Sequence, residues 1–214
     1  MRIQFVQTVR CGALLALILA GCATKPYDYT NFRAHPPRSI LVLPPLNEST
    51  DIGGTYGYLS TVTQPVAEMG YYVFPVAVVD HFCKENGMPG AGEMHQAPLD
   101  KIREIIGADA VLYITLKQYG TKYQVINSAT TVLAEAKLVD TRTGTLLWAG
   151  TLLAQDNSGG AGNIFGDLIV AVVTQAINKS TDHAHNVSRM ANTQFAVKDH
   201  GLLPGPYHPK HGSD

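Results

Sequence analysis

The chain has 214 residues, an apolar fraction of 45%, a charged fraction of 15% and a formal net charge of −1. This composition is typical of a folded globular protein, and it excludes both a disordered chain and one with the basic charge of a nucleic-acid binder. The length suffices for one domain with a sizeable hydrophobic core.

The amino-terminal segment predicts a secretory signal rather than a membrane span. Arg2 and Arg10 are followed by the run CGALLALILAGC, whose apolar part is shorter than the about 20 residues that cross a bilayer. A basic start, a short apolar stretch and small residues at its end are the features of a signal peptide. We therefore expect residues 1–21 to be removed.

The end of this segment resembles the lipobox of bacterial lipoproteins. Residues 19–22, LAGC, give an aliphatic residue, two small residues and a cysteine. The resemblance implies cleavage before Cys22 and acylation of its sulfur and its amine, and several acyl chains hold a protein firmly to a membrane. Ala23 and Thr24 stand where an aspartate would favour the inner membrane, so the resemblance implies the outer membrane. The alternative is an ordinary signal with an unrelated cysteine.

The cysteines exclude an internal disulfide in the mature chain. Cys11 leaves with the signal and Cys22 is lipidated, so that Cys83 has no partner. The polar, proline-containing stretch that follows predicts a flexible tether, so residues 22–38 are the lipidated cysteine and its tether.

Alternating strands and helices are predicted for the first half of the body. Continuous apolar runs predict buried strands at 39–47 and 71–75, and helical spacing predicts helices at 59–70, 76–87 and 98–107, with a loop at 88–96. A strand–helix–strand unit predicts parallel strands. The expected buried helix positions are Leu59, Val62, Val66, Met69, Val78, Val79, Phe82, Leu99, Ile102, Ile105 and Ile106.

The second half predicts an antiparallel meander. Strands are expected at 109–120, 130–140 and 144–156, with short turns at 120–122 and 140–144. Asp140 is expected to cap the second turn, Gly144 to adopt a positive φ, and Trp148 to lie in the core.

The carboxy-terminal third is predicted to contain one helix and a tail. Residues 158–162 are glycine-rich and interrupt the sheet, and 163–180 has the spacing of a very apolar helix for the core or for self-association. Residues 183–214 hold five of the eight histidines and are predicted to be a poorly ordered tail. The fold class is therefore α/β: one three-layer-like domain over 39–182, with a mixed sheet and packing helices.

Three stretches together resemble a known family. They are ILVLPPLNES, GADAVLYITL and LVDTRTGTLLWAG. The set resembles bacterial lipoproteins of unknown function that include a meningococcal lipoprotein vaccine candidate. It is more distantly similar to the amino-terminal domain of the Tol-system periplasmic protein and to the curli secretion-channel lipoprotein. The resemblance implies a self-associating envelope protein without established catalysis, and only Cys22 receives a definite role from it.

Two stretches raise the question of chemistry. Asp80, His81 and Cys83 lie close in sequence, but helical neighbours one and two apart do not face each other, which favours Cys83 as a plain buried residue. Residues 159–166, GGAGNIFG, have the wrong glycine spacing for a dinucleotide fingerprint and lack the lysine of a P-loop.

The histidines of the predicted tail are the third candidate. They show no tight paired spacing, which favours weak metal binding over a zinc centre. They are His183, His185, His200, His208 and His211.

We therefore expect a protein that is not an enzyme and holds no metal or cofactor. The hypothesis is a lipid-anchored protein of the outer membrane that faces the periplasm, forms a homodimer and contacts other envelope proteins, as an accessory part of an export or assembly apparatus. The alternatives are a subunit of a curli-channel-like secretion pore, which needs additional amphipathic strands, and a small-ligand-binding lipoprotein.

Overall fold

The computed structural model describes residues 27–123, 128–157 and 183–213. Cys22 and the stretches 159–166 and 163–180 lie outside the described residues, so the predictions for them stay predictions. The helices are α2 (Thr30–Ala34), α3 (Gly54–Glu68), α4 (Val76–Glu85), α5 (Ala91–Met94), α6 (Leu99–Lys101), the π-turn η1 (Ile102–Ile106), α7 (His183–Asn192) and the 3₁₀ turn η2 (Thr193–Ala196). The strands are β1 (Ser39–Val42), β2 (Leu46–Asn47), β3 (Tyr72–Val73), β4 (Ala110–Tyr123), β5 (Ser128–Asp140) and β6 (Leu146–Asn157).

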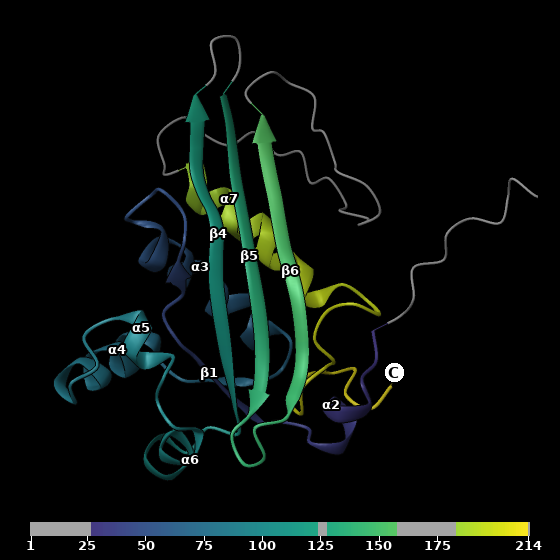
Figure 1. The fold of residues 1–214 in the computed structure, drawn as a ribbon. Helices are drawn as coiled ribbons and strands as arrows, with labels where there is room; N and C mark the ends of the chain where they lie inside the picture. The colour runs from purple at the N-terminus through teal and green to yellow at the C-terminus, as the bar shows by residue number, and fades with distance from the viewer. Residues whose placement is uncertain (1–26, 124–127, 158–182, 214) are drawn as a thin grey trace, which may run out of the picture.

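One mixed sheet organises the described chain, as predicted. Its strand order is β3-β1-β4-β5-β6, and β2 pairs with β4 beside β1 (Figure 1). The short strands β1, β2 and β3 form parallel pairs, whereas β4, β5 and β6 form an antiparallel meander. Pro44 and Pro45 separate β1 from β2 because proline cannot donate a ladder hydrogen bond.

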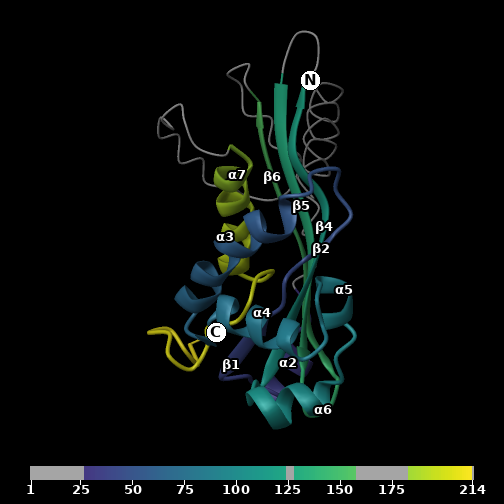
Figure 2. The same ribbon diagram turned by 90° about the vertical axis from the view of Figure 1, so that its left-hand side faces the viewer.

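Helices pack on both faces of the parallel half. Side chains alternate along β1, so Ile40 and Val42 join the core under α3 and α7, while Leu41 and Leu43 join a second core with α4, α5 and η1. Figure 2 shows α3 and α7 on one side of the sheet and α5 and α6 on the other. The predicted three-layer arrangement is thus present around β1 and β4.

The second face of the meander is exposed to solvent instead, and it carries polar side chains beside the exposed Leu153. Glu135 and Lys137 on β5 and Thr151 on β6 are exposed there, whereas the opposite faces of both strands are buried under α7. This alternation is the pattern of an antiparallel sheet with one buried face and one solvent-exposed face. It explains why the three strands were recognisable from sequence.

The predicted turn at 120–122 was wrong, since both strands of the first hairpin are longer than expected. Residues 120–122 lie inside β4, and the ladder with β5 continues to Tyr123 and Ser128. The backbone at residue 120 favours glycine, since its φ is +111° and an added Cβ would lie 3.2 Å from Asp51 Oδ2.

Three helix predictions need correction. Helix α3 begins at Gly54, five residues before the predicted start, and its Gly57 lies so close to Tyr119 that an added Cβ would collide with the tyrosine hydroxyl. On α4, Val78 and Phe82 are exposed rather than buried, since Val79 and Cys83 form the inward face. The predicted loop at 88–96 contains α5, whose Met94 is fully buried.

The predicted helix at 98–107 also differs from expectation. Residues 99–106 begin as α6 and end as the π-turn η1, and only Ile102 is buried, while Ile105 is exposed. The wider turn rotates the residues after Ile102 relative to an α-helix, so the α-helical spacing places Ile105 on the wrong face.

The predicted tether was wrong from residue 27 onward. Tyr29 and Phe32 are buried in the core beneath α2, and the Tyr29 hydroxyl donates a hydrogen bond of 2.6 Å to the Gly201 carbonyl. The Tyr27 backbone N–H donates to the Asp199 carbonyl at 3.0 Å. Aromatic side chains bury a large apolar area, so Tyr29 and Phe32 attach this otherwise polar segment to the domain.

The predicted disordered tail was also wrong. Helix α7 places Val187 and Ala191 in the core, and Phe195 and Leu202 follow them there. The C-terminal segment then returns along the end of α3, where the N–H groups of Gly205 and Tyr207 donate to the Met69 and Gly70 carbonyls. The domain therefore extends well past the predicted boundary at residue 182.

Polar groups inside this core join α3 to α7. The Tyr58 hydroxyl donates to Asn192 Oδ1 at 2.5 Å, and Asn192 Nδ2 donates to Thr61 Oγ1 at 3.0 Å. All three side chains are buried, and burial raises the pKa of Tyr58 far above its usual range. The network stays neutral and satisfied, which is the condition for burying polar groups without loss of stability.

Tyr58→Phe is expected to lower the free energy of unfolding by about 1–3 kcal/mol, because it leaves the Asn192 carboxamide oxygen without its donor. Urea denaturation monitored by circular dichroism measures this loss. The matched control is Tyr56→Phe, since Tyr56 is exposed and its hydroxyl bonds to Asp80 and Lys84 at the surface. Equal losses in the two variants would contradict the importance of the network.

The second hairpin and Trp148 agree with the predictions. Asp140 Oδ1 accepts hydrogen bonds from the N–H groups of Arg142 and Thr143, and Gly144 has a φ of +70°. Trp148 is 1% exposed, and its Nε1 donates to the His200 carbonyl at 2.8 Å. The indole therefore joins β6 to the segment that was predicted to be disordered.

Candidate functional site

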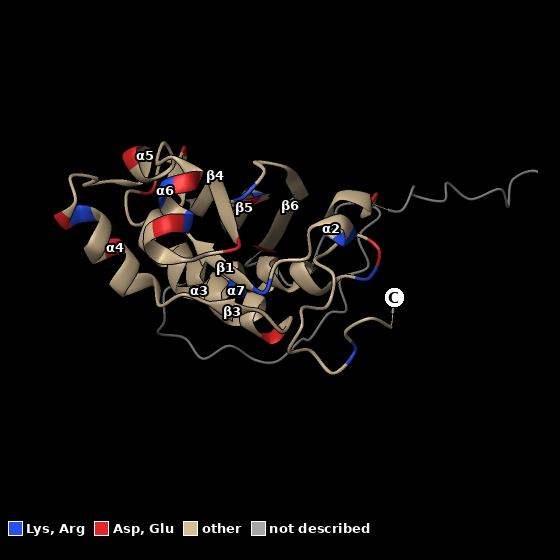
Figure 3. Ribbon diagram, turned by 90° about the horizontal axis from the view of Figure 1, so that it is seen from below, with Lys and Arg blue, Asp and Glu red and all other residues tan. Residues whose placement is uncertain are grey.

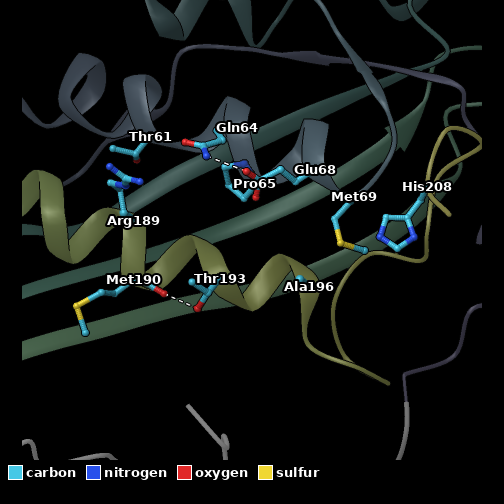
Figure 4. Close-up of a pocket in the computed structure, with 10 residues that line it drawn as sticks. All are labelled: Thr61, Gln64, Pro65, Glu68, Met69, Arg189, Met190, Thr193, Ala196 and His208. Atoms are coloured by element: carbon cyan, nitrogen blue, oxygen red, sulfur yellow. Dashed lines mark hydrogen bonds between the residues drawn. The ribbon is translucent and has the colours of Figure 1, made fainter. Parts of the chain in front are cut away.

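A groove of about 460 Å³ lies between α3 and α7 (Figure 4). We call it the α3–α7 groove. Helix α3 and its end contribute Thr61, Gln64, Pro65, Glu68 and Met69, and Arg189, Met190, Thr193, Ala196 and His208 contribute from α7, η2 and the C-terminal segment.

The groove combines an apolar lining with charges at its rim. Figure 4 shows Arg189 extending from α7 toward α3, on the side of Thr61. Glu68 accepts a hydrogen bond of 2.8 Å from Gln64 Nε2, its neighbour one turn away on α3. In the described part of the chain, Arg189 forms no ion pair. An exposed guanidinium at one end of a groove that also contains Met190 and Pro65 suits a ligand that carries an anionic group and an apolar one.

The structure does not assemble a thiol site from the residues near Cys83. The Cys83 side chain is buried, and burial, with a further contribution from Asp80, raises the pKa of its thiol. Asp80 instead pairs with Lys84 at 2.6 Å and accepts a hydrogen bond from the Tyr56 hydroxyl. His81 points elsewhere on the helix and is exposed. The predicted burial of Cys83 is therefore confirmed, and a thiol with a raised pKa is a poorer nucleophile than a free one.

The histidines of residues 183–213 lie at separate places. His183 Nε2 lies 2.8 Å from Asp156 Oδ2, His208 borders the α3–α7 groove, and His211 Nδ1 donates to the Pro204 carbonyl. In the described ranges, no group of three or more His, Cys, Asp and Glu side chains is placed to hold a metal.

His95 is a titratable group that the sequence reasoning missed. It lies on the other face of the sheet, where Nε2 donates to the Pro44 carbonyl at 2.9 Å and the ring meets Tyr113 edge-on at 5.2 Å. Burial lowers the pKa of His95 from its ordinary 6.5, although the hydrogen bond to Pro44 opposes that change. The neutral imidazole is therefore the form that the folded protein prefers.

This lowered pKa predicts a loss of stability in acid. The unfolded chain binds a proton at His95 more readily than the folded chain, so the stability that His95 supplies is complete above pH 6.5 and is lost as the pH falls below that value. His95→Gln is expected to reduce the fall in free energy of unfolding between about pH 7.5 and pH 5.5, measured by urea denaturation. His81→Gln, at an exposed position, is the control, and an unchanged slope for His95→Gln would contradict the assignment.

Sequence reasoning also missed the α3–α7 groove. Arg189, Met190 and Thr193 belong to the stretch that was predicted to be disordered, so no partner helix was assigned to α3. The available signal was the spacing of Ala184, Val187 and Ala191, which marks one buried helix face. The few apolar residues beside it made that signal weak.

Comparisons with known proteins agree on one family. The family model described as "Putative lipoprotein GNA1162-like" matches residues 27–207. The Neisseria meningitidis protein "Putative lipoprotein NMB1124/NMB1162" is 43% identical over 201 residues, which are 91% of this chain and 94% of that one. The crystal structure of lipoprotein GNA1162 from Neisseria meningitidis is 50% identical with a TM-score of 0.55, and the match covers 59% of this chain and 88% of that one.

A more distant solved structure shows weaker similarity. The PelC dodecamer from Paraburkholderia phytofirmans is 11% identical with a TM-score of 0.43, over 79% of this chain and 92% of that chain. At this level of similarity, the likeness carries no inference about assembly or function.

Proposed function

Because this chain belongs to the GNA1162-like family of bacterial lipoproteins, we propose that it is a lipid-anchored envelope protein that acts by binding other envelope proteins. The family resemblance predicted from three sequence stretches is confirmed. A lipoprotein is attached to a membrane through its lipid, and in the described ranges no helix is long and apolar enough to span one.

The anchor in this proposal is Cys22. The LAGC motif supports acylation there, and Ala23 after the cysteine supports transfer to the outer membrane with the body in the periplasm. The folded domain begins a few residues later, because Tyr27 is already hydrogen-bonded to the body. The anchor would therefore hold a rigid body close to the lipid surface.

The observation that supports binding rather than catalysis is the α3–α7 groove. Its exposed Arg189 shares the groove with apolar side chains, and the hydroxyls of Thr61 and Thr193 in its lining donate to backbone carbonyls. Such a groove fits a protein segment with an acidic residue near an apolar residue. We propose that a segment of this kind, from another component of an export or assembly apparatus, is its ligand.

Site-specific photocrosslinking in living cells tests this role. A photoreactive residue at Met190, which is 40% exposed at the groove, is expected to yield discrete adducts with an envelope protein. Arg189→Glu in the same chain is expected to abolish those adducts, because the groove would then repel an acidic ligand.

Two controls accompany this experiment. Ile105 is an exposed apolar position on the other side of the sheet, and a photoreactive residue there should not give the same adducts. Arg142→Glu reverses an exposed charge in the β5–β6 turn and should leave the Met190 adducts intact. Identical adducts from Met190 and Ile105 would contradict a role for the groove.

We retain self-association as part of the proposal, although one edge of the sheet, β6, is partly covered. On β6, the Leu153 N–H and carbonyl bond to the Gln194 side chain, and the Ala149 N–H donates to the Tyr27 hydroxyl. These contacts block strand-to-strand pairing at the centre of β6. A homodimer would then use exposed side chains such as Val78 and Phe82 of α4, and would appear as crosslinks between two copies.

The long strands favour this role over a pore subunit. β4, β5 and β6 bury one face under α3 and α7, so they are already used by the domain's own core. A pore would need strands from elsewhere in the chain.

A further inference from the structure

The structure fixes the chain to the body unusually close to the proposed lipid anchor. The Tyr27 N–H donates to the Asp199 carbonyl at 3.0 Å, and its hydroxyl accepts a hydrogen bond from the Ala149 N–H at 3.0 Å. Its ring packs on Tyr29 with centroids 5.0 Å apart, and Tyr29 is buried. These contacts join Tyr27 to β6 and to the C-terminal segment at once.

The distance from the anchor to this point has an upper limit. Four residues separate Cys22 from Tyr27, so five peptide units can span at most about 18 Å, whatever their conformation. The body is longer than this limit, since the 13 residues of β5 extend about 44 Å. Because this connection is shorter than the body, only the surface near Tyr27 can lie against the membrane.

The attachment lies at one end of the sheet. Ala149 is near the start of β6, and α2 beside it donates from Asn31 Nδ2 to the Leu146 carbonyl. Figure 1 shows α2 and the C-terminal segment at the end of the sheet opposite the far ends of β4 and β5. The loop that holds Ile52 lies near that far end, because Asp51 sits beside Gly120.

The two segments around the attachment carry a small excess of exposed positive charge. Among residues 27–38 and 197–213, the exposed cations outnumber the exposed acids, Asp28 and Asp199. Figure 3 shows this end of the molecule, with α2 and the C-terminal segment in view. The cations are Arg33, Arg38, Lys198 and Lys210. Basic residues held near an anionic membrane surface are attracted to it, within the range that salt allows.

We infer that α2 and the segment 197–213 form the membrane-facing surface of the protein, and that the far ends of β4 and β5 point away from the membrane. The inference rests on the proposed anchor at Cys22 and adds an orientation to it. The occupant of this surface is a phospholipid layer with anionic headgroups. The α3–α7 groove meets this surface only at His208, and its other lining residues come from α3, α7 and η2 on the side of the body.

Fluorescence quenching by headgroup-nitroxide lipids tests the orientation. The full lipidated chain is placed in phosphatidylethanolamine–phosphatidylglycerol vesicles, with one dye on Ala34→Cys or on Ile52→Cys. Ala34 is exposed on α2 and Ile52 is 99% exposed at the far end, whereas the native Cys83 is buried and reacts slowly. The dye on Ala34→Cys is expected to lose its fluorescence and the dye on Ile52→Cys to keep it.

The possible outcomes separate the anchor from the orientation. If the protein floats with the vesicles, the anchor stands. Equal quenching of both dyes, or stronger quenching of the dye on Ile52→Cys, would then overturn the orientation alone. If the protein floats but the dye on Ala34→Cys is not quenched by the nitroxide lipids, this surface is covered by a second copy or another protein. That result would also overturn the orientation. Failure of the lipidated chain to float would overturn the proposed anchor and the orientation with it. The same order of quenching on phosphatidylcholine vesicles would support the connection length as its main cause.

Discussion

Trp148→Ala is expected to lower the free energy of unfolding by about 3–5 kcal/mol, the range for removing a large aromatic side chain from a packed core. The indole is 1% exposed and packs against Phe195 with ring centroids 5.6 Å apart. The substitution also leaves the His200 carbonyl without the Nε1 donor at 2.8 Å. Since the C-terminal segment is held partly through this bond, its protease resistance should fall together with global stability.

Urea denaturation followed by far-ultraviolet circular dichroism measures this effect, because the variant has lost the chain's one tryptophan. Trp148→Phe is the control that keeps most of the apolar volume and removes the donor, and it should lose clearly less stability. A loss below about 1 kcal/mol for Trp148→Ala would mean that the 195–205 segment does not cover β6 as described.

Cys22→Ser is expected to release the protein from the membrane fraction. The hydroxyl cannot take the thioether-linked lipid, and several acyl chains are what would hold the body firmly to a bilayer. Fractionation followed by flotation of membranes should show the wild-type chain with the membranes and the variant in the soluble fraction or as an unprocessed precursor.

The matched control for this variant is Cys11→Ser. It changes the other cysteine of the amino-terminal segment, which is outside the LAGC motif, and should leave the distribution unchanged. A Cys22→Ser chain that stays processed and membrane-bound would contradict lipidation as the means of attachment.

The meander and the parallel strands were predictable because local patterns determine them. Ile40 to Leu43 form a continuous apolar run and are buried on both faces, whereas β5 alternates buried and exposed residues across one wet face. The β5–β6 turn was predictable in detail, since Asp140 and Gly144 meet requirements of the turn itself.

The two ends of the domain were not predictable because distant contacts order them. The segment before β1 is polar apart from a few aromatic residues, and nothing in it announces that Tyr29 will reach Gly201 across the fold. The segment after α7 is likewise held through Tyr71, whose hydroxyl donates to the Leu203 carbonyl, and through Trp148. In sequence each end resembles a disordered tail. In the structure the two ends contact each other, through Tyr29 and Gly201 among others, and both join the core.

In the candidate site, too, local features were predictable from sequence and contacts between distant segments were not. The prediction that Cys83 is buried was confirmed, because the burial of one helix position is a local property. The α3–α7 groove needs two helices far apart in sequence and the Tyr58–Asn192 contact that joins them. No spacing within either helix indicates that contact.

Mass spectrometry of the protein purified from bacterial membranes tests the central claim most directly. The account predicts a mature chain that begins at Cys22 and carries the mass of a diacylglycerol on the sulfur and an acyl chain on the amine. An unmodified residue 22, or a chain that begins at another residue, would contradict it.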